Sequence, residues 1–360
     1  MKIKILFIAL ALFTSCSKSK PEASVIPESG FFIRGADLSA LPQIESTHAV
    51  FYNLSGQEEN FLTILKNSGV NTVRLRLWNH PVTGYSSFDE VKTFSAKIDS
   101  LGLKVWIDLH YSDTWADPSH QEPPLAWQGI SFDALNDSVY NFTKKVVSEI
   151  VPDFIQIGNE INPGFLLPEG AISNKTQFLR LLSSGVKAVR DYSDSAKIII
   201  HYAGIEEADW FFSTISQVDY DIIGISYYPV WHGHDLSKLE SVLANLGNSW
   251  QKEIVIAETA YPFTLQWNDQ THNIIGLESQ LILPGYPASP QGQKDFLAKI
   301  KHIMEANKQG IGFCYWGGEL VAFNGTQATD GSPWENQALF DFNNKALPAL
   351  KVFNYGCFSK

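Results

Sequence analysis

Residues 57–78 read QEENFLTILKNSGVNTVRLRLW, and they contain the repeating unit of the fold. The spacing of apolar residues predicts a helix over 57–68, and Gly69 stands where a helix C-cap is expected. The apolar run 72–78 then predicts a strand. The same order returns around Gly102. Strands that alternate with helices in this way are typical of βαβ units and a parallel sheet.

The alternation continues from about residue 31 to the end of the chain. The predicted strands are 32–37, 72–78, 104–110, 154–159, 197–202, 221–228, 254–258 and 312–316. The predicted helices are 57–68, 87–100, 133–149, 176–191, 207–216, 236–247 and 291–308. An open sheet would rarely repeat the unit so regularly. The sequence therefore predicts an α/β fold, a single (β/α)8 TIM barrel, that occupies residues 31–360.

The composition favours a large core and argues against nucleic acid as a partner. Of the 360 residues 44% are hydrophobic, which is ample for one barrel domain. The net charge is -11 and only 18% of residues are charged, whereas nucleic-acid binding needs clustered Lys and Arg. The 10 Trp are a high count, and Trp faces stack on sugar rings as well as pack in cores.

The N-terminus predicts export. Residues 1–16 read MKIKILFIALALFTSC, in which two lysines precede an apolar run that is too short for a stable membrane span. We expect a signal peptide, and Cys16 resembles the acylated cysteine of bacterial lipoproteins. An ordinary secretory signal that is cut nearby is the alternative. Residues 17–30 predict a flexible tether, so the protein would be lipid-anchored in the cell envelope, facing the periplasm or the outside.

The other cysteines are Cys314 and Cys357. Cys314 falls in a predicted strand, which favours a buried free thiol, although a disulfide between the two is compatible with an oxidising compartment. Their spacing does not indicate a metal site.

Two connections are unusually long, 111–132 after the third predicted strand and 259–290 after the seventh. Long loops in a compact domain are usually functional, and both leave the barrel face on which such enzymes place their active sites.

Polar or aromatic side chains stand at the ends of the predicted strands, whereas a barrel interior is normally filled by Val, Ile and Leu. Any one of them could be an ordinary rim residue, but together they predict a site. These residues are Asp37, His110, Tyr111, Asp113, Trp115, Asp117, Asn159, Glu160, His201, Tyr202, Tyr227, Tyr228, Trp231, His232, Glu258 and Trp316. The second predicted strand instead carries Arg74 and Arg76 among its apolar residues.

Glu160 and Glu258 follow apolar residues at the ends of the fourth and seventh strands. Glycoside hydrolysis requires two such carboxyls, one protonated to donate to the leaving oxygen and one ionised to attack or to activate water. Their surroundings decide which is which. The alternative is a structural salt bridge to Arg74 or Arg76.

Other chemistries lack their usual signatures. The sequence has no G-x-S-x-G elbow, P-loop or G-x-G-x-x-G after a strand, and no H-E-x-x-H motif. The histidines without helical pairing are His80, His110, His120, His201, His232 and His234. Sugar hydrogen bonding explains them more simply than a metal.

Long runs of the sequence resemble glycoside hydrolase family 53, the retaining endo-β-1,4-galactanases of clan A. The runs are GADLS (35–39), GVNTVRLRLWNHP (69–81), GLKVWIDLHYSDTWADPSHQEPPLAW (102–127), PDFIQIGNEINPG (152–164), DYDIIGISYYPVWHG (219–233), VIAETAYPFT (255–264) and NQALFDF (336–342). The resemblance covers nearly the whole chain after the tether.

The resemblance implies a retaining endo-hydrolase of β-1,4-galactan, the linear part of type I arabinogalactan in pectin side chains. It implies that Glu160 is the general acid/base, Glu258 the nucleophile, and Asn159 the amide that holds the 2-hydroxyl of the cleaved sugar. Arg74 and Tyr228 would attend the nucleophile, and Trp316 would lie under the sugar. By analogy the cleft would also be lined by Asp37, His110, Trp115, Asp117, His201, Trp231 and His232.

No cofactor is needed for this chemistry, but some family members bind a structural calcium in the loop after the seventh strand. Here that loop reads WNDQTHNIIG (267–276) and offers few carboxylates, whereas calcium takes six to eight oxygen ligands. The candidate ligands are Asp269, Asn273, Ser332 and Glu335.

Two alternatives remain beside a monomeric galactanase. The first is another clan A endoglycosidase such as a β-mannanase, which the run DLHYSDTWADP (108–118) disfavours. The second is a catalytically inactive, tethered glycan-binding protein, which the presence of both glutamates disfavours.

Overall fold

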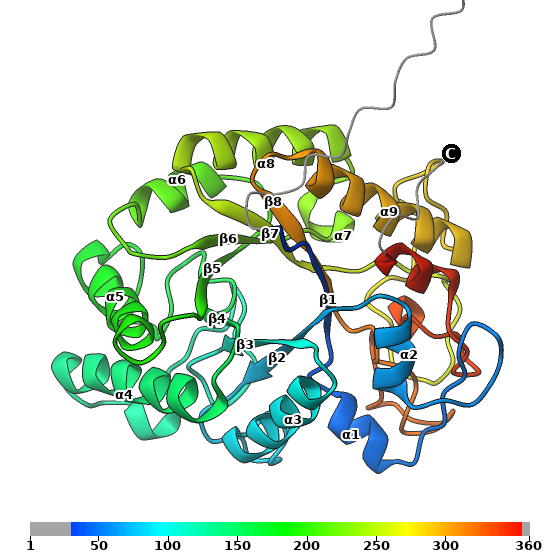
Figure 1. Ribbon diagram of the computed structural model, residues 1–360, viewed down its shortest axis with the longest axis horizontal. Helices are drawn as coiled ribbons and strands as arrows, with labels where there is room; N and C mark the ends of the chain where they lie inside the picture. The colour runs from blue at the N-terminus through cyan, green and yellow to red at the C-terminus, as the bar shows by residue number, and fades with distance from the viewer. Residues whose placement is uncertain (1–29, 355–360) are drawn as a thin grey trace, which may run out of the picture.

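The computed structural model describes residues 30–354, and its strands close into the predicted barrel. Neighbouring strands are parallel, in the order β1 to β8 with β8 pairing back to β1. Figure 1 shows the strands in the centre with the helices around them. The strands are β1 (Ile33–Asp37), β2 (Thr72–Leu77), β3 (Lys104–Leu109), β4 (Phe154–Ile157), β5 (Lys197–Ala203), β6 (Ile222–Ser226), β7 (Glu253–Thr259) and β8 (Gly310–Tyr315).

The helices agree with the predicted ones apart from their ends and two short additions. They are α1 (Leu41–Ser46), α2 (Phe61–Asn67), α3 (Phe88–Ser100), α4 (Phe132–Ile150), α5 (Lys175–Tyr192), α6 (Ala208–Thr214), α7 (Pro229–His232), α8 (Leu236–Trp250) and α9 (Pro290–Ala306). Helices α1 and α7 are not among the predicted helices, because six and four residues are too few to show helical periodicity. Short 3₁₀ turns are η1 (Leu125–Trp127), η2 (Glu278–Gln280), η3 (Glu335–Gln337) and η4 (Pro348–Phe353).

Local sequence explains where the helices begin and which side packs on the barrel. Helix α2 begins at Phe61 rather than at 57, because the Asn60 side chain accepts a hydrogen bond from the Thr63 N–H and caps it. Helix α8 begins after Asp235, whose side chain accepts from the backbone of Ser237 and Lys238. One face of α8 is apolar and buried, formed by Leu236, Leu239, Leu243 and Leu246.

The barrel interior has an apolar floor and a polar upper layer. On β3, β4 and β5 the apolar residues Trp106, Phe154 and Ile199 belong to a small buried cluster that is separate from the main core. Side chains alternate between the two faces of a strand, so the residues two positions further along point inward as well. Those residues are Asp108, Gln156 and His201, and each is fully buried. Polar groups therefore fill the barrel immediately beneath its mouth.

Long connections leave the carboxyl ends of β3 and β7, as predicted. A third long connection, 316–347, follows β8 and leads to η4. It is not among the predicted long loops, because the sequence predicts no helix or strand after β8 that would mark its end. Within residues 30–354 no helix is both long and apolar enough to cross a membrane.

Several predictions fall on residues that the structure does not describe. The signal peptide (1–16) with Cys16, the tether up to residue 29, and Cys357 lie outside the described residues. Cys314 is a buried thiol on β8, and its pairing with Cys357 stays a prediction.

Candidate active site

A cavity of about 550 Å³ lies where the strands end. Its wall is formed by Arg74, Arg76, His110, Trp115, Ala116, Asp117, Pro118, Ser119, Asn159, Glu160, Ala203, Tyr228, Trp231, His232, Glu258, Ile274, Trp316, Pro333 and Trp334. The wall thus contains both glutamates that the sequence singled out. It also contains most of the residues expected to line a cleft around them.

Asp37 and His201 are exceptions, and the expectation that they line the cleft needs correction. Neither belongs to the cavity wall, and their exposed fractions are 2% and 0%. Asp37 Oδ2 lies 2.7 Å from Arg74 Nη1, and His201 contacts Asn159 and Ser226. Both side chains point into the barrel one layer below the mouth, where they hold other residues in place.

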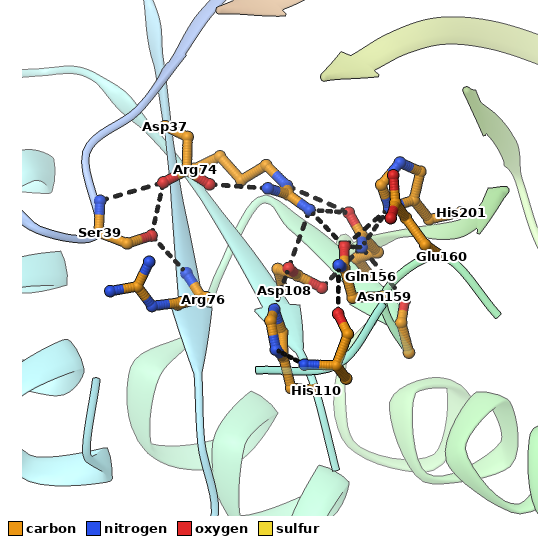
Figure 2. Close-up of polar contacts among 12 residues, drawn as sticks. Asp37, Ser39, Arg74, Arg76, Asp108, His110, Gln156, Asn159, Glu160 and His201 are labelled. Atoms are coloured by element: carbon orange, nitrogen blue, oxygen red, sulfur yellow. Dashed lines mark hydrogen bonds and ion pairs between the residues drawn. The ribbon is translucent and has the colours of Figure 1, made fainter. Parts of the chain in front are cut away.

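Arg74 is the centre of the polar layer. Its guanidinium forms ion pairs with Asp37 at 2.7 Å, Asp108 at 2.8 Å and Glu258 at 2.9 Å, and only 1% of the side chain is exposed. Nη2 also donates to Asn159 Oδ1 at 2.9 Å. Figure 2 shows Arg74 reaching from Asp37 on one side to Asn159 on the other. Burial opposes the charge, but the Asp108, Glu258 and Asp37 carboxylates raise the pKa of Arg74 well above its usual value.

Glu258 is held on two sides by donors. Oε1 pairs with Arg74, and Oε2 accepts a hydrogen bond from the Tyr228 hydroxyl at 3.0 Å. The β7 pairing with β6 and β8 shifts register next to Glu258, a local irregularity of the kind found beside active sites. The salt bridge to Arg74, which the sequence offered as the alternative to a catalytic role, is therefore present at Glu258. The same Glu258 carboxylate also faces the cavity.

Glu160 reaches the same cavity from the end of β4 through an unusual backbone. Gly158 and Glu160 have positive φ angles of 80° and 47°, so the chain turns sharply as the strand ends. A positive φ is uncommon for a residue with a side chain and is often found at functional sites. The turn brings Oε1 to 2.5 Å from Ser226 Oγ, which donates to it. No other hydrogen bond to the Glu160 carboxyl is found among residues 30–354.

The two glutamates compete for one positive charge. Burial raises the pKa of both Glu160 and Glu258, Arg74 opposes this, and the Glu160 carboxylate raises the pKa of Glu258 further. Glu258 has the direct contacts with Arg74 and Tyr228, whereas Glu160 has only a neutral hydroxyl. We therefore place the negative charge on Glu258 and the proton on Glu160. The cavity then presents one ionised and one protonated carboxyl.

Other polar residues of the wall are fixed by their neighbours. His110 Nδ1 accepts from Trp78 Nε1 and from the Ala116 N–H, so its Nε2–H donates to Asp108 at 3.0 Å. Burial lowers the pKa of His232 to about 4, which makes it neutral. Gly204 permits its approach, since a Cβ at that position would lie 2.8 Å from the His232 ring.

Tryptophans form the sides of the cavity. Trp115 is 43% exposed, and its ring packs against the Arg76 guanidinium. The distance from Arg76 Cζ to the centroid of the Trp115 ring is 4.0 Å. Trp316 and Trp334 meet edge to face at 4.7 Å, and Trp231, which is 55% exposed, stacks on Trp334 at 6.0 Å. Exposed indole faces beside polar groups suit sugar rings, which have an apolar face and a polar edge.

Four residues of the site were not singled out in the sequence, namely Asp108, Gln156, Ser226 and Trp334. Asp108 and Gln156 are the next-to-last residues of β3 and β4, and Ser226 is the last residue of β6. A signal was available, because a polar residue in an apolar barrel strand points inward when it alternates in step with the other inward-facing residues of that strand. Trp334 comes from the long connection after β8 and is buried in the wall. Nothing in the local sequence predicts that position.

The calcium candidates meet at the loops that follow β7 and β8. Three buried oxygens there have no hydrogen-bond partner among the described residues, namely Asp269 Oδ2, Asn273 Oδ1 and Glu335 Oε2. Glu335 Oε1 lies 3.4 Å from the Asp269 N–H and 3.5 Å from Asn273 Nδ2, so the three side chains are neighbours. Ser332 Oγ instead accepts from the Trp334 N–H. Unpartnered oxygen donors fit a hard cation, although residues 30–354 hold no cluster of three metal-binding acids, histidines or cysteines.

Comparison with known proteins places this arrangement in a family. Residues 33–353 match the model described as Glycosyl hydrolase family 53. The chain is 34% identical over 374 residues to the arabinogalactan endo-beta-1,4-galactanase of Cellvibrio japonicus (strain Ueda107), covering 98% of this chain and 97% of that protein. It is 32% identical over 426 residues to the endo-beta-1,4-galactanase of Bacillus subtilis (strain 168), again with 98% and 97% covered.

A solved structure agrees with both comparisons. The Ignisphaera aggregans GH53 catalytic domain matches with a TM-score of 0.86 and 39% identity, over 93% of this chain and 97% of that one. The resemblance noted in the sequence is confirmed, and the chain belongs to glycosyl hydrolase family 53.

Proposed function

We propose that this protein is a monomeric, retaining endo-hydrolase of β-1,4-galactosidic bonds in galactan and type I arabinogalactan. The observation that carries the proposal is the unequal environment of two carboxyls in one cavity. Glu258 has Arg74 and Tyr228 as partners, and Glu160 has Ser226. Retaining glycoside hydrolysis requires this difference. Family membership and the galactanase names of the relatives support the substrate.

In the first step the Glu258 carboxylate attacks the anomeric carbon while the glycosidic C–O bond breaks. The electron pair of that bond stays on the leaving oxygen, which takes the proton from Glu160. Arg74 and Tyr228 keep Glu258 ionised and aim its oxygens before the attack. Burial, which raises the pKa of Glu160, keeps the acid protonated near neutral pH.

In the second step water attacks the same carbon from the opposite side. Glu160, now ionised, accepts the proton of the water, and the electrons of the ester bond return to Glu258. Arg74 and Tyr228 stabilise the carboxylate as it leaves. Two inversions at one carbon give net retention.

Asn159 and the tryptophans would bind the sugar. Asn159 Oδ1 accepts from Arg74, and one N–H of its amide donates to the Ala116 carbonyl at 2.8 Å. The second N–H is left for the 2-hydroxyl of the cleaved sugar. Trp316 would lie beneath that sugar, and Trp115 and Trp231 offer exposed faces to its neighbours along the chain.

Product analysis on a polysaccharide panel tests the proposal. The purified protein should depolymerise linear β-1,4-galactan into short oligosaccharides and leave β-mannan, xylan and β-glucan intact. Proton NMR of the first products should show the β-anomer before mutarotation. Preference for mannan would establish the mannanase alternative, and binding of galactan without cleavage would establish the inactive glycan-binding protein.

We also propose a structural calcium that joins the loops after β7 and β8. Asp269, Asn273 and Glu335 would supply side-chain oxygens, and backbone carbonyls and water would complete the shell. The ion would neutralise two buried carboxylates and would take no part in bond cleavage.

For localisation, we propose attachment to the cell envelope through an acylated Cys16. The proposal rests on the hydrophobic run before Cys16 and on the polar residues 17–30 after it. An endo-hydrolase on such a tether would act on soluble galactan at the membrane surface.

A further inference from the structure

A row of fully buried polar groups lies behind Glu160. Ser226 Oγ is 2.5 Å from Glu160 Oε1, and His201 Nε2 is 2.8 Å from the same Oγ. His201 Nδ1 in turn lies 3.0 Å from Gln156 Nε2. Ser226, His201 and Gln156 are each 0% exposed. Figure 2 shows His201 beside Glu160, with Gln156 between His201 and Arg74.

The position of each hydrogen follows from counting donors. The Ser226 hydroxyl has one hydrogen, and when it goes to Glu160 the serine oxygen can only accept from His201. Burial and the nearby Arg74 lower the pKa of His201 well below its usual value, so its ring is neutral and carries one hydrogen. With the Ser226 hydrogen on Glu160, the ring hydrogen is on Nε2 and Nδ1 is an acceptor.

Gln156 is oriented to supply the donor that Nδ1 needs. Its Oε1 accepts from Arg74, and its Nε2 donates to Asp108 Oδ1 at 2.6 Å, so the amide cannot be reversed without losing both contacts. The second N–H of Gln156 has three acceptors within reach, namely His201 Nδ1 at 3.0 Å, Asn159 Oδ1 at 3.1 Å and the Gly158 carbonyl at 3.1 Å. A ring hydrogen on Nδ1 would instead donate to Asn159 Oδ1 at 2.9 Å, so the tautomer of His201 decides the direction. With the hydrogen on Nε2, the hydrogen-bond direction runs from Gln156 through His201 and Ser226 to Glu160.

We propose that Ser226 and His201 are positioning residues that fix Glu160 Oε1 as a permanent hydrogen-bond acceptor. Oε1 then cannot be the oxygen that holds the proton. The proton must reside on Oε2, which has no partner among residues 30–354 and belongs to a carboxyl in the cavity wall. In the first step Oε2–H gives its proton to the leaving oxygen, and in the second Oε2 takes a proton from water. This inference rests on the proposed function and deepens it.

The Ser226 hydrogen bond also affects the pKa of Glu160. Burial raises that pKa, and the Ser226 donor lowers it, since the donor stabilises the ionised form. Loss of the hydroxyl should therefore raise the pKa further. The titratable or charged groups around Glu160 that keep their influence in such a variant are Arg74, Asp108, Asp117, His201, Tyr228, His232 and Glu258.

Ser226→Ala tests the proposal with two substrates. Turnover of galactan should fall about tenfold. This is a fraction of the roughly 10²–10⁴-fold rate enhancement that a correctly positioned general acid contributes. The kcat/KM for a dinitrophenyl β-galactobioside should stay within about twofold of wild type, because that leaving group needs no proton. The alkaline limb of the galactan pH profile should move to higher pH, and Ser226→Thr, which keeps the hydroxyl, should restore the wild-type limb.

Ser184→Ala is the matched control. Ser184 is a buried serine on α5 whose hydroxyl donates to a backbone carbonyl away from the cavity, so its loss should leave both substrates and the pH profile unchanged. An equal loss of Ser226→Ala on the two substrates, or an unmoved alkaline limb, would overturn the proposal. If wild type itself fails to cleave galactan, the proposed function is wrong instead.

Nitrogen-15 NMR of His201 in the wild-type enzyme gives an answer that needs no variant. The neutral ring should carry its hydrogen on Nε2 across the active pH range. A ring with its hydrogen on Nδ1 would receive the Ser226 hydrogen at Nε2, which would leave none for Glu160, and the proposal would fail.

Discussion

At the residue scale, Arg74 explains why the two glutamates differ. A guanidinium has five N–H donors in a rigid plane, so one side chain can pair with Asp37, Asp108 and Glu258 together. A lysine at this position would offer one compact charge and three donors. The fixed plane aims Nη2 at both Glu258 and Asn159. This contact favours the ionised form of Glu258 and fixes the orientation of the Asn159 amide.

The roles of the two glutamates can be separated with azide. Glu258→Ala should lose galactan turnover by on the order of 10⁴ or more, because no nucleophile remains. With an activated aryl galactobioside, azide should fill the vacated space and give the α-galactosyl azide. Glu160→Ala should still react with that substrate through Glu258, and azide should then give the β-galactosyl azide.

Product configuration from each variant, read by proton NMR, checks the assignment. The same anomer from both variants would contradict it, as would near-normal galactan hydrolysis by Glu258→Ala. Circular dichroism of each variant establishes that the barrel is intact, so that loss of turnover reports chemistry.

At the element scale, the loops after β7 and β8 depend on each other. Asp269 and Asn273 come from the first and Glu335 from the second, and each has a buried oxygen without a partner. Chelation with EDTA should lower the melting temperature of wild type by several degrees, on the scale of roughly 1–3 kcal/mol for an unpaired buried polar group. Added calcium should restore the melting temperature of wild type. The melting temperature of Glu335→Gln should change less on addition of either EDTA or calcium. A melting temperature that EDTA leaves unchanged would remove the calcium proposal.

The connection after β8 also holds a pH-sensitive contact with the start of α1. Glu319 Oε1 accepts from the Ala40 N–H at 2.9 Å, and Oε2 is buried without a partner. Burial, with a smaller effect of Asp37, raises the pKa of Glu319 to about 8. The folded state thus binds a proton that the unfolded chain loses at lower pH, so this stabilisation is complete in acid and disappears as the pH rises through about 8.

Urea unfolding from about pH 5 to about pH 9 measures this effect. The free energy of unfolding of wild type should fall over that range, and Glu319→Gln should fall less because an amide does not ionise. Glu240→Gln, at an exposed glutamate on α8, should follow wild type. Parallel curves for Glu319→Gln and wild type would show that Glu319 is not protonated in the folded protein.

At the scale of the whole molecule, barrel closure makes the site possible. Strands β4 and β7 are not neighbours, yet closure brings Glu160 and Glu258 to one cavity. The tether that the sequence predicts before the barrel would determine where that cavity works. In a Gram-negative host the full-length chain should partition into Triton X-114 and carry acyl chains on Cys16, whereas Cys16→Ser should be secreted as a soluble, fully active enzyme. A wild-type chain without lipid by mass spectrometry would leave only the ordinary secretory signal.

The sequence by itself determined the barrel, the family and most of the cavity wall. Local patterns were sufficient there, because helix and strand periodicity, glycine caps and strand-end residues are properties of short segments. The same patterns predicted Glu160 and Glu258 and the long loops after β3 and β7.

Only the tertiary structure decided which polar residues reach the cavity and which lie beneath it. In the sequence Asp37 and His201 stand near strand ends, as the wall residues do, but the tilt and stagger of neighbouring strands leave them one layer lower. Asp108 pairs with Arg74, Gln156 donates to Asp108, and Ser226 donates to Glu160. Each of these contacts joins two segments that are distant in the sequence, so no local pattern identifies it. We place the charge on Glu258 and the proton on Glu160 because of such long-range contacts. Arg74 on β2 and Tyr228 after β6 reach Glu258, whereas Glu160 receives the neutral Ser226 hydroxyl.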